Sequence, residues 1–287
     1  MKKQISKIFS SDGELSKNIK GFKPRAEQLE MAQSVGYAIQ NKRPLVVEAG
    51  TGTGKTFAYL APALIAGKKT IISTGSKNLQ DQLFSRDLPA IKKALNYSGK
   101  IALLKGRSNY LCLERLDQVI AQGVLGDKSV LADLSKVRKW NNATKTGDLT
   151  ECIELAEDSP ILPQLTSTVE SCLGTDCPNY AECYVAQARK KALNADLVVV
   201  NHHLFFADMA VKESGFGELI PKAEVIIFDE AHQLPDIASQ YFGQSLTSRQ
   251  LFDLCKDINI VYRTELKDMP QLGTTADTLL KIIQDFR

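Results

Sequence analysis

Residues 48–56 read Glu-Ala-Gly-Thr-Gly-Thr-Gly-Lys-Thr, a glycine-rich segment from which much of the architecture can be predicted. A short apolar run at 45–47 precedes it, and a helical pattern over 57–66 follows. A strand, a glycine-rich turn and a helix in this order form a phosphate cradle, because the backbone N–H groups of the turn and the helix N-terminus both attract anions. We therefore predict that the segment binds a nucleotide through Ala49, Gly50, Thr51, Gly52, Thr53, Gly54, Lys55 and Thr56.

Two side chains of this segment suit nucleotide chemistry. Lys55 can reach the β- and γ-phosphates, and the Thr56 hydroxyl can ligate Mg²⁺. The pattern G-x-x-x-x-G-K-[ST] has an alanine, Ala49, at its first position here. The alternative is a glycine-rich turn that binds nothing, and the strand and helix patterns on both sides argue against it.

The composition is that of a globular protein, with 44% hydrophobic and 24% charged residues in a chain of 287. The net charge of +3 permits nucleic-acid binding through local patches but does not require it. No apolar run approaches the roughly 18 residues that a membrane span needs, and the basic start lacks the apolar segment of a secretory signal. We therefore expect a cytoplasmic protein, in which clustered cysteines hold a metal or act in catalysis more often than they form disulfides.

Short apolar runs alternate with helical stretches along much of the chain. The runs cover 45–47, 70–73, 101–104, 197–200 and 225–228, and helical patterns cover 26–40, 57–66 and 77–95. This alternation predicts an α/β fold with a mostly parallel sheet covered by helices. Residues 111–184 break the pattern, so we predict an insertion there with little apolar core of its own. Beyond residue 235 the chain becomes helical and polar.

The last apolar run, 225–228, ends in two adjacent carboxylates. Asp229 is predicted to hold the Mg²⁺ shell, and Glu230 to accept the proton of the attacking water. His232 is then expected near the γ-phosphate, where it can report the state of the nucleotide. Together with Lys55 and Thr56, these residues predict the core of a nucleoside triphosphatase.

The two motifs resemble motifs I and II of superfamily 2 helicases, which implies a RecA-like P-loop motor domain. Residues 22–28 resemble the adenine-recognition element of these enzymes, where Gln28 would read the adenine edge and Arg25 would lie near the nucleotide. Residues 72–75, followed by 79–83, resemble motif Ia, which contacts the backbone of single-stranded DNA. The resemblance thereby places Thr74 among the DNA contacts.

Three of the six cysteines lie close together in the sequence, between 172 and 183. Structural zinc sites usually contain two C-x₂₋₄-C pairs, and an even series of three cysteines whose second gap has five residues fits them poorly. A fourth thiolate must come from elsewhere, and one cysteine followed much later by C-x₄-C-x₅-C resembles the [4Fe–4S] insertion of the DinG/XPD helicases. Cys112, Cys152 and Cys255 are available as the fourth thiolate, and the resemblance implies that Cys112, Cys172, Cys177 and Cys183 are the ligands. We expect Cys152 and Cys255 to be ordinary buried cysteines without a metal.

Basic and aromatic residues surround Cys112. Cationic groups can follow a phosphate backbone while an aromatic face stacks on a base, although a solvated loop is the ordinary alternative. The basic run 189–191 fits a solvated helix face and a DNA path equally well. The pair His202 and His203 fits a structural or DNA-adjacent motif better than a metal site. The predicted DNA contacts of the Cys112 region are Lys105, Arg107, Asn109 and Tyr110.

The resemblance implies an ATP-dependent DNA helicase that moves 5′ to 3′ on single-stranded DNA, with Mg²⁺ and a [4Fe–4S] cluster, in DNA repair or replication. Its predicted parts are a motor segment at 1–110, the iron–sulfur insertion at 111–184, a second motor segment at 185–235 and the start of a helical arch at 236–287. No second motor domain follows, so we expect an N-terminal fragment that binds nucleotide better than it hydrolyses it. Two classes stay open: a non-motor iron–sulfur NTPase and a zinc-bearing nucleic-acid-binding module.

Overall fold

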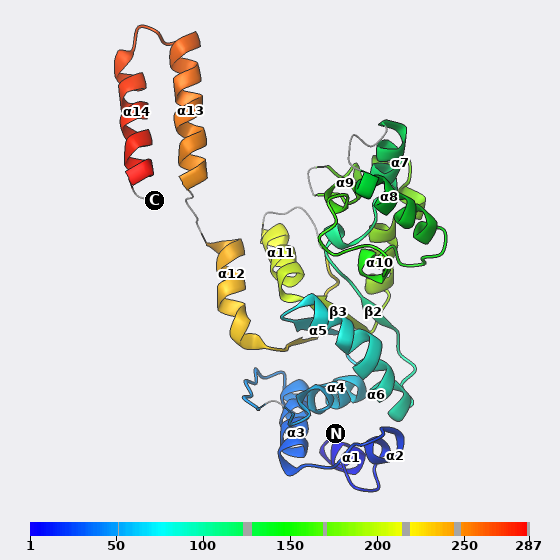
Figure 1. The fold of residues 1–287 in the computed structure, drawn as a ribbon. Coiled ribbons are helices and arrows are strands. Elements are labelled where there is room, and N and C mark those ends of the chain that lie inside the picture. The colour runs from blue at the N-terminus through cyan, green and yellow to red at the C-terminus, as the bar shows by residue number, and fades with distance from the viewer. Residues whose placement is uncertain (51, 123–127, 169–170, 214–218, 244–247, 286–287) are drawn as a thin grey trace. The chain divides into compact units, whose positions relative to one another are not determined.

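A computed structural model describes residues 1–50, 52–122, 128–168, 171–213, 219–243 and 248–285. The contacts divide the chain into two compact units, Met1–Ile237 and Ala238–Arg287 (Figure 1). Each unit is described by itself. Across the described ranges, no helix has the length and apolar character needed to cross a membrane.

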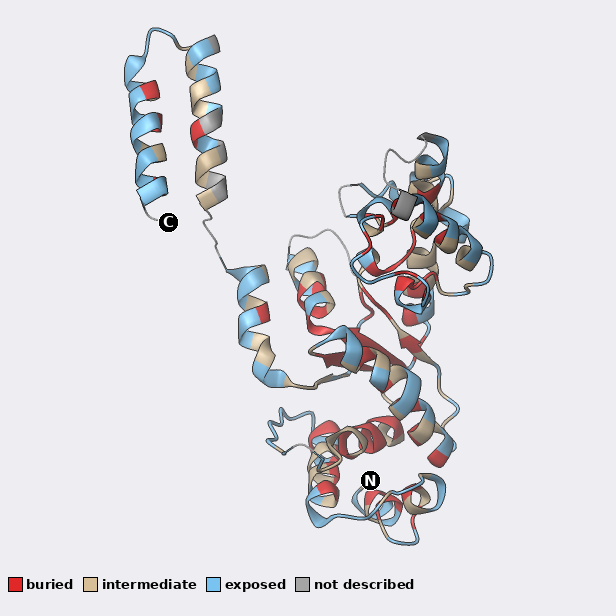
Figure 2. Cartoon of the chain, viewed as in Figure 1, coloured by how far each residue is buried: buried red, intermediate tan, exposed pale blue. Residues whose placement is uncertain are grey.

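The first unit contains a four-stranded parallel sheet in the order β2-β3-β1-β4. In the register of the sheet, Ile72 lies between Val199 and Ile227. β1 and β3 are buried along their whole length, as apolar strands covered by helices should be (Figure 2). The predicted α/β fold with a parallel sheet is therefore confirmed. The strands are β1 (Thr70–Thr74), β2 (Ile101–Leu103), β3 (Leu197–Asn201) and β4 (Val225–Phe228).

The helices that precede and follow β1 in the sequence share one hydrophobic core with the sheet. The core contains buried residues of the N-terminal helices, such as Ile5 and Leu15, together with Leu60, Ile91 and Val199. The predicted helix at 77–95 is helical throughout, with a π-helical turn at Leu83–Asp87 between its two α-helical parts. The helices are α1 (Lys2–Ile8), α2 (Glu14–Asn18), α3 (Ala26–Asn41), α4 (Lys55–Ala66), α5 (Lys77–Gln82), α6 (Leu88–Ala94), α10 (Tyr184–Leu193), α11 (His202–Glu213) and α12 (Leu234–Phe242).

The predicted strand at 45–47 is wrong. These three residues have no regular secondary structure, and their exposed fractions lie between 40% and 96%. β4 forms an edge of the described sheet, where Ile226 is 47% exposed. The run contains only three apolar residues between Pro44 and Glu48, and such a short run has no period that distinguishes a strand from an apolar loop.

Residues 111–165 form a helical part with a hydrophobic cluster of its own. Leu111, Val137, Ile161 and Leu165 are almost completely buried in it, and Cys152 is 3% exposed. The expectation that this region has little apolar core is therefore wrong. The core residues are spread over helices and short turns, so no single stretch of sequence shows a strong period. The α-helices of this region are α7 (Leu113–Gln122), α8 (Lys128–Asn141) and α9 (Leu162–Leu165).

The second unit contains two helices that pack on each other, α13 (Ser248–Thr264) and α14 (Pro270–Asp285). A side chain at Gly273 would meet the ring of Tyr262 at 2.9 Å, so a glycine is needed for this close approach. Cys255 is fully buried in the unit. That this unit begins a helical arch stays a prediction.

Candidate functional site

The glycine-rich loop meets the N-terminus of α4 at Gly54, whose φ of +83° lies in the left-handed region. A Cβ atom at this position would also collide with the side-chain amide of Gln28, so only glycine fits. Gln28 donates from Nε2 to the main-chain oxygen of Gly54 at 2.9 Å. The upstream element and the phosphate loop are therefore joined directly, as neighbouring parts of one site.

The side chains of the loop and of the carboxylate motif converge. Lys55 Nζ lies 3.2 Å from Glu230 Oε1, and both side chains are about 30% exposed or less. The Tyr59 hydroxyl donates to Asp229 Oδ2 at 3.1 Å and also bonds the side chain of Thr56. One hydroxyl thus connects the two residues predicted to bind Mg²⁺. Sequence reasoning missed Tyr59, although its spacing of three and four residues from Thr56 and Lys55 places it on their face of α4.

The electrostatics of this cluster suit a cation. Burial raises the pKa of Asp229, and the nearby Glu230 carboxylate raises it further, while Tyr59 and Lys55 oppose the shift. Glu230 itself has a φ of +57°, a conformation that costs a non-glycine residue about 1–2 kcal/mol. Such strain persists only where the surroundings fix the backbone, and it is often found at functional sites.

His232 lies at the rim of the cluster. Its Nδ1 is 3.5 Å from Glu230 Oε2, and the side chain is 69% exposed. His202, by contrast, is completely buried. Its two ring nitrogens hydrogen-bond to Ser73 in the motif Ia segment and to the main-chain oxygen of Asp229 in the carboxylate motif. The sequence indicated a structural or DNA-adjacent role for His202 without predicting these bonds.

The remaining predicted nucleotide residues surround the same loop. An Arg25 guanidinium nitrogen donates to the oxygen of Gly52, and Thr53 donates to the oxygen of Gly50 at 2.9 Å. A Cβ at Gly50 or Gly52 would contact nothing within 4 Å, so this part of the loop is open. Ala49 adjoins the loop on its N-terminal side, and Thr51 lies outside the described residues.

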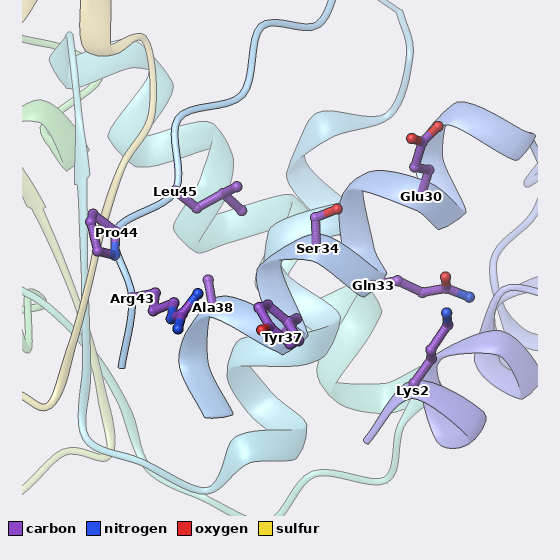
Figure 3. Close-up of a pocket in the computed structure, with 9 residues that line it drawn as sticks. All are labelled: Lys2, Glu30, Gln33, Ser34, Tyr37, Ala38, Arg43, Pro44 and Leu45. Carbon is purple, nitrogen blue, oxygen red and sulfur yellow. The ribbon is translucent and has the colours of Figure 1, made fainter. Parts of the chain in front are cut away.

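A separate hollow of about 390 Å³ lies between α1, α3 and residues 43–45 (Figure 3). Tyr37 and Gln33 on α3 line it, together with Lys2 and Leu45. None of the predicted nucleotide residues is among its lining residues. The hollow is therefore separate from the predicted phosphate site.

The residues predicted to contact DNA differ in how far they are buried. Thr74, Asn109 and Tyr110 are buried, and the Tyr110 hydroxyl accepts a hydrogen bond from the backbone of Lys105 at 3.1 Å. Arg107 is half-buried and donates to the oxygen of Thr168 at 3.2 Å. Of this set, Arg107 is therefore the cation best placed to meet a phosphate.

Lys105 is fully buried, with a side chain 0% exposed. Its ammonium lies 2.7 Å from Asp81 on α5 and 2.7 Å from Asp148 of the 111–165 region, and it donates to Thr150 at 3.1 Å. Burial alone would lower the pKa of Lys105, but the bonds to Asp148 and Asp81 outweigh it and the pKa is raised. In this position the Lys105 ammonium connects α5 to the 111–165 region, and it is not exposed to a DNA backbone.

Replacing Lys105 with methionine is expected to destabilise the protein by about 3 kcal/mol. Breaking a buried ion pair typically costs about 3–5 kcal/mol because a charge is left uncompensated. The low end applies because 38% of the Asp81 side chain is exposed. Denaturant unfolding measures the change, and Lys100→Met, at an exposed lysine, should shift stability by no more than about 0.5 kcal/mol. Equal stability of the two variants, with weaker DNA binding for Lys105→Met, would instead favour the predicted DNA contact.

The four cysteines predicted as ligands lie near one another. Burial raises the pKa of the Cys112 thiol, and the thiols of Cys183, Cys177 and Cys172 raise it further through charge repulsion. Cys112 directly precedes α7 and Cys183 is the N-cap of α10, so two of the four cysteines lie at helix N-termini. A backbone N–H, that of Arg115, also bonds the Cys112 sulfur.

This thiol group does not have the geometry of a single-ion site. Across the described ranges, no three His, Cys, Asp or Glu side chains are arranged to hold one metal ion. In an iron–sulfur cube, each thiolate binds a different iron, so the sulfurs lie farther apart than around one ion. Two cations, Arg107 and Arg189, lie close to each other beside the thiols of Cys172 and Cys183. The donor set and its positive surroundings fit a cluster bound by thiolates.

A cleft of about 1570 Å³ runs along β2, between α5, α10 and the 111–165 region. Asn109 and Tyr110 lie in its wall, as do several backbone and side-chain atoms of β2. Its exposed lysines come from both sides, which makes the rim basic. They are Lys77, Lys100, Lys145, Lys190 and Lys191.

The phosphate loop, the paired carboxylates and the parallel sheet together define a P-loop motor domain of the helicase type. The DEAD/DEAH box helicase family matches residues 29–153. The chain is 89% identical over 99% of its length to the ATP-dependent DNA helicase YoaA of Haemophilus influenzae, and 65% identical over 97% to YoaA of Escherichia coli. It is also 36% identical over 79% to the ATP-dependent helicase DinG of Mycobacterium tuberculosis.

The chain therefore contains a DEAD/DEAH-box helicase domain and is similar over almost its whole length to the two YoaA proteins. The predicted resemblance to DinG-type helicases is confirmed. The chain spans 44% of the length of each of the two YoaA relatives and 37% of the DinG relative.

Proposed function

We propose that this chain is the ATP-binding motor part of an ATP-dependent DNA helicase that moves 5′ to 3′ on single-stranded DNA. The observation that carries the proposal is the contact between Lys55 and Glu230, at 3.2 Å, from motifs 175 residues apart. Around this contact, Thr56 and Asp229 share the Tyr59 hydroxyl. These are the groups that phosphoryl transfer needs: a cation for the phosphates, ligands for Mg²⁺ and a base for water.

Each residue then has a role in hydrolysis. Lys55 would hold the β- and γ-phosphates, and Thr56 with Asp229 would hold Mg²⁺, which neutralises the developing charge. Glu230 would move from Lys55 to the attacking water once phosphates occupy the loop. Gln28 Oε1 is buried and has no hydrogen-bond partner among the described residues, so it is free to accept from the adenine amino group. Arg25 and His232 would flank the nucleotide.

We further propose that Cys112, Cys172, Cys177 and Cys183 hold a [4Fe–4S] cluster. The mutual proximity of the four thiols, the helix N-termini at two of them and the nearby Arg107 and Arg189 support it. No residue from 171 to 183 is buried, so packing does little to hold this segment. A bound cluster would supply the missing cross-link.

Strand separation tests the proposed polarity. The natural protein that carries this chain is expected to displace a strand from a duplex with a 5′ single-stranded tail, with ATP and Mg²⁺. A matched duplex with a 3′ tail is the control. Displacement from the 3′-tailed duplex alone would reverse the polarity, and displacement from neither would contradict the motor function.

Binding of single-stranded DNA is expected to weaken steeply with salt. We propose that the strand follows the basic rim of the cleft and Arg107, so that lysines such as Lys77, Lys190 and Lys191 neutralise phosphates. Each neutralised phosphate contributes about 0.7 to the slope of log affinity against log salt. Lys190→Gln should therefore reduce the slope by about 0.7.

Fluorescence anisotropy with a labelled oligothymidine at several salt concentrations measures this slope. The control is Lys3→Gln, at an exposed lysine of α1, which should leave the slope unchanged. An equal slope in the Lys190→Gln variant, or tighter binding to duplex than to single strand, would contradict the proposed path.

A further inference from the structure

His202 lies outside the nucleotide cluster, yet both of its ring nitrogens bond to functional segments. It is the first residue of α11, directly after β3, and its side chain is completely buried. Nδ1 lies 2.7 Å from the hydroxyl oxygen of Ser73, near the end of β1. Nε2 lies 2.9 Å from the main-chain oxygen of Asp229, directly after β4. One ring thus bridges the carboxyl ends of two neighbouring strands.

The bonding partners determine which nitrogen carries the proton. A carbonyl oxygen can only accept, so Nε2 must donate to Asp229. Nδ1 of the neutral ring then accepts, and the Ser73 hydroxyl is the donor. Each donor in this chain of hydrogen bonds therefore points the same way, from Ser73 to His202 and from His202 to Asp229. Because these groups are buried, loss of either hydrogen bond would leave a polar atom without a partner.

The ring is held in place by its neighbours. It packs against Phe228, with ring centroids 5.9 Å apart, and Phe228 in turn packs edge-to-face on Phe205 at 4.9 Å. His202 therefore cannot rotate without disturbing the end of β4. The two hydrogen bonds of the ring therefore connect Ser73 to Asp229 through one packed side chain.

Two further contacts join the same segments. The backbone N–H of Asp229 donates to the oxygen of Ser73 at 2.8 Å. Gly75 approaches Gln233 so closely that a Cβ atom would lie 2.5 Å from the Gln233 side-chain oxygen. Residues 73–75 and 229–233 consequently form one packed unit, in which His202 is the side-chain link.

The two ends of this unit have different functions. Residues 76–78, which follow Gly75, are exposed and include Lys77 of the cleft rim. On the other side, the bonded carbonyl of Asp229 directly precedes the strained Glu230. If the carbonyl were released, the peptide between them could rotate and Glu230 would lose its orientation toward Lys55.

We propose that His202 is a positioning residue that couples DNA bound at residues 76–78 to the carboxylates Asp229 and Glu230. DNA that moves the end of β1 would thereby set the position of the Glu230 base. The inference rests on the proposed function, because it requires DNA and ATP at these two ends.

The test uses the natural protein that carries this chain. ATP hydrolysis is measured with and without oligothymidine, and oligothymidine affinity is measured in parallel. His202→Ala is expected to reduce the stimulation by DNA about tenfold, within the usual range of roughly 5–150-fold for coupling between sites. The rate without DNA should fall much less than the stimulated rate, and the DNA affinity should change by less than about twofold, the scatter expected for uncoupled sites.

A conservative variant and a matched control distinguish a positioning role of His202 from a role in packing alone. His202→Gln keeps an amide donor for the Asp229 carbonyl and should retain most of the stimulation. His203→Gln, at the adjacent and exposed histidine, should behave like the unaltered protein. Should His202→Ala fail to fold, Ser73→Ala removes only the hydroxyl and is expected to lower the stimulation in the same direction. Where both single variants fold, their combination should cost no more than His202→Ala alone.

Several outcomes overturn the inference. Stimulation that survives in His202→Ala would show that the bridge is not used. If His202→Ala lowered the hydrolysis rates with and without DNA equally, and His202→Gln did not restore them, His202 would be shown to act only in packing. Absence of stimulation in the unaltered protein would overturn the proposed function as well, so the two failures are distinguishable.

Discussion

Replacing Glu230 with glutamine is expected to lower the rate of ATP hydrolysis by about 10²–10⁴-fold, the usual contribution of a general base. Glutamine has nearly the shape of glutamate and retains an oxygen that can accept from Lys55 at the observed 3.2 Å. It cannot take a proton from water. Nucleotide binding should therefore be preserved, or strengthened, since Lys55 no longer has a carboxylate as a competing partner.

The comparison with Lys55→Ala makes this test specific. That change removes a charge-assisted contact worth about 1.5–3 kcal/mol, so ATP should bind at least about tenfold more weakly. Titration calorimetry with ATP and a steady-state hydrolysis assay on the natural protein separate the two effects. If Glu230→Gln abolished binding, its role as proton acceptor would be contradicted. Unchanged ATP affinity in Lys55→Ala would remove the phosphate loop from the site.

The sequence predicted those parts of the site that depend on local pattern. Four of the five apolar runs became strands, and two of these strands, β1 and β3, are buried along their whole length. The motifs at Lys55 and Glu230 could be placed together because an apolar strand that ends in paired carboxylates is the expected partner of a phosphate loop. The run at 45–47, which was predicted to be a strand, has only three residues, and all three are exposed.

Partners formed over long distances in the sequence were harder to predict. Lys105 looked like a DNA contact because it lies in a basic run, but two carboxylates from distant segments, Asp81 and Asp148, enclose it. His202 gave a similar difficulty, since its partners are 129 and 27 residues away. A sequence read alone shows the charge of a side chain but not the groups that neutralise it.

The cysteine variants should divide sharply by iron content. In single Cys→Ser variants, the loss of Cys112, Cys172, Cys177 or Cys183 is expected to remove the cluster and its visible absorption, because a cube with a missing thiolate is poorly held. Cys152→Ser and Cys255→Ser are matched controls. Both of those thiols are buried in hydrophobic packing, 3% and 0% exposed, so their replacement should leave the iron content unchanged.

The structural consequence of cluster loss should be confined to one segment. Residues 111–165 have a hydrophobic core of their own, so they should stay folded without iron. Residues 171–183 contain no buried side chain and form only two short 3₁₀ turns, Gly174–Asp176 and Tyr180–Glu182. We therefore expect limited proteolysis to cut this segment faster in the ligand variants, with helical content and ATP affinity unchanged.

Iron analysis, visible spectra and the proteolysis pattern of anaerobically purified protein check these expectations together. Full iron in Cys112→Ser with loss of iron in Cys152→Ser would show that the fourth ligand is Cys152. Stoichiometric zinc without iron would exclude the cluster itself. Unfolding of 111–165 in the ligand variants would show that the metal, and not the apolar packing around Val137 and Ile161, stabilises that region.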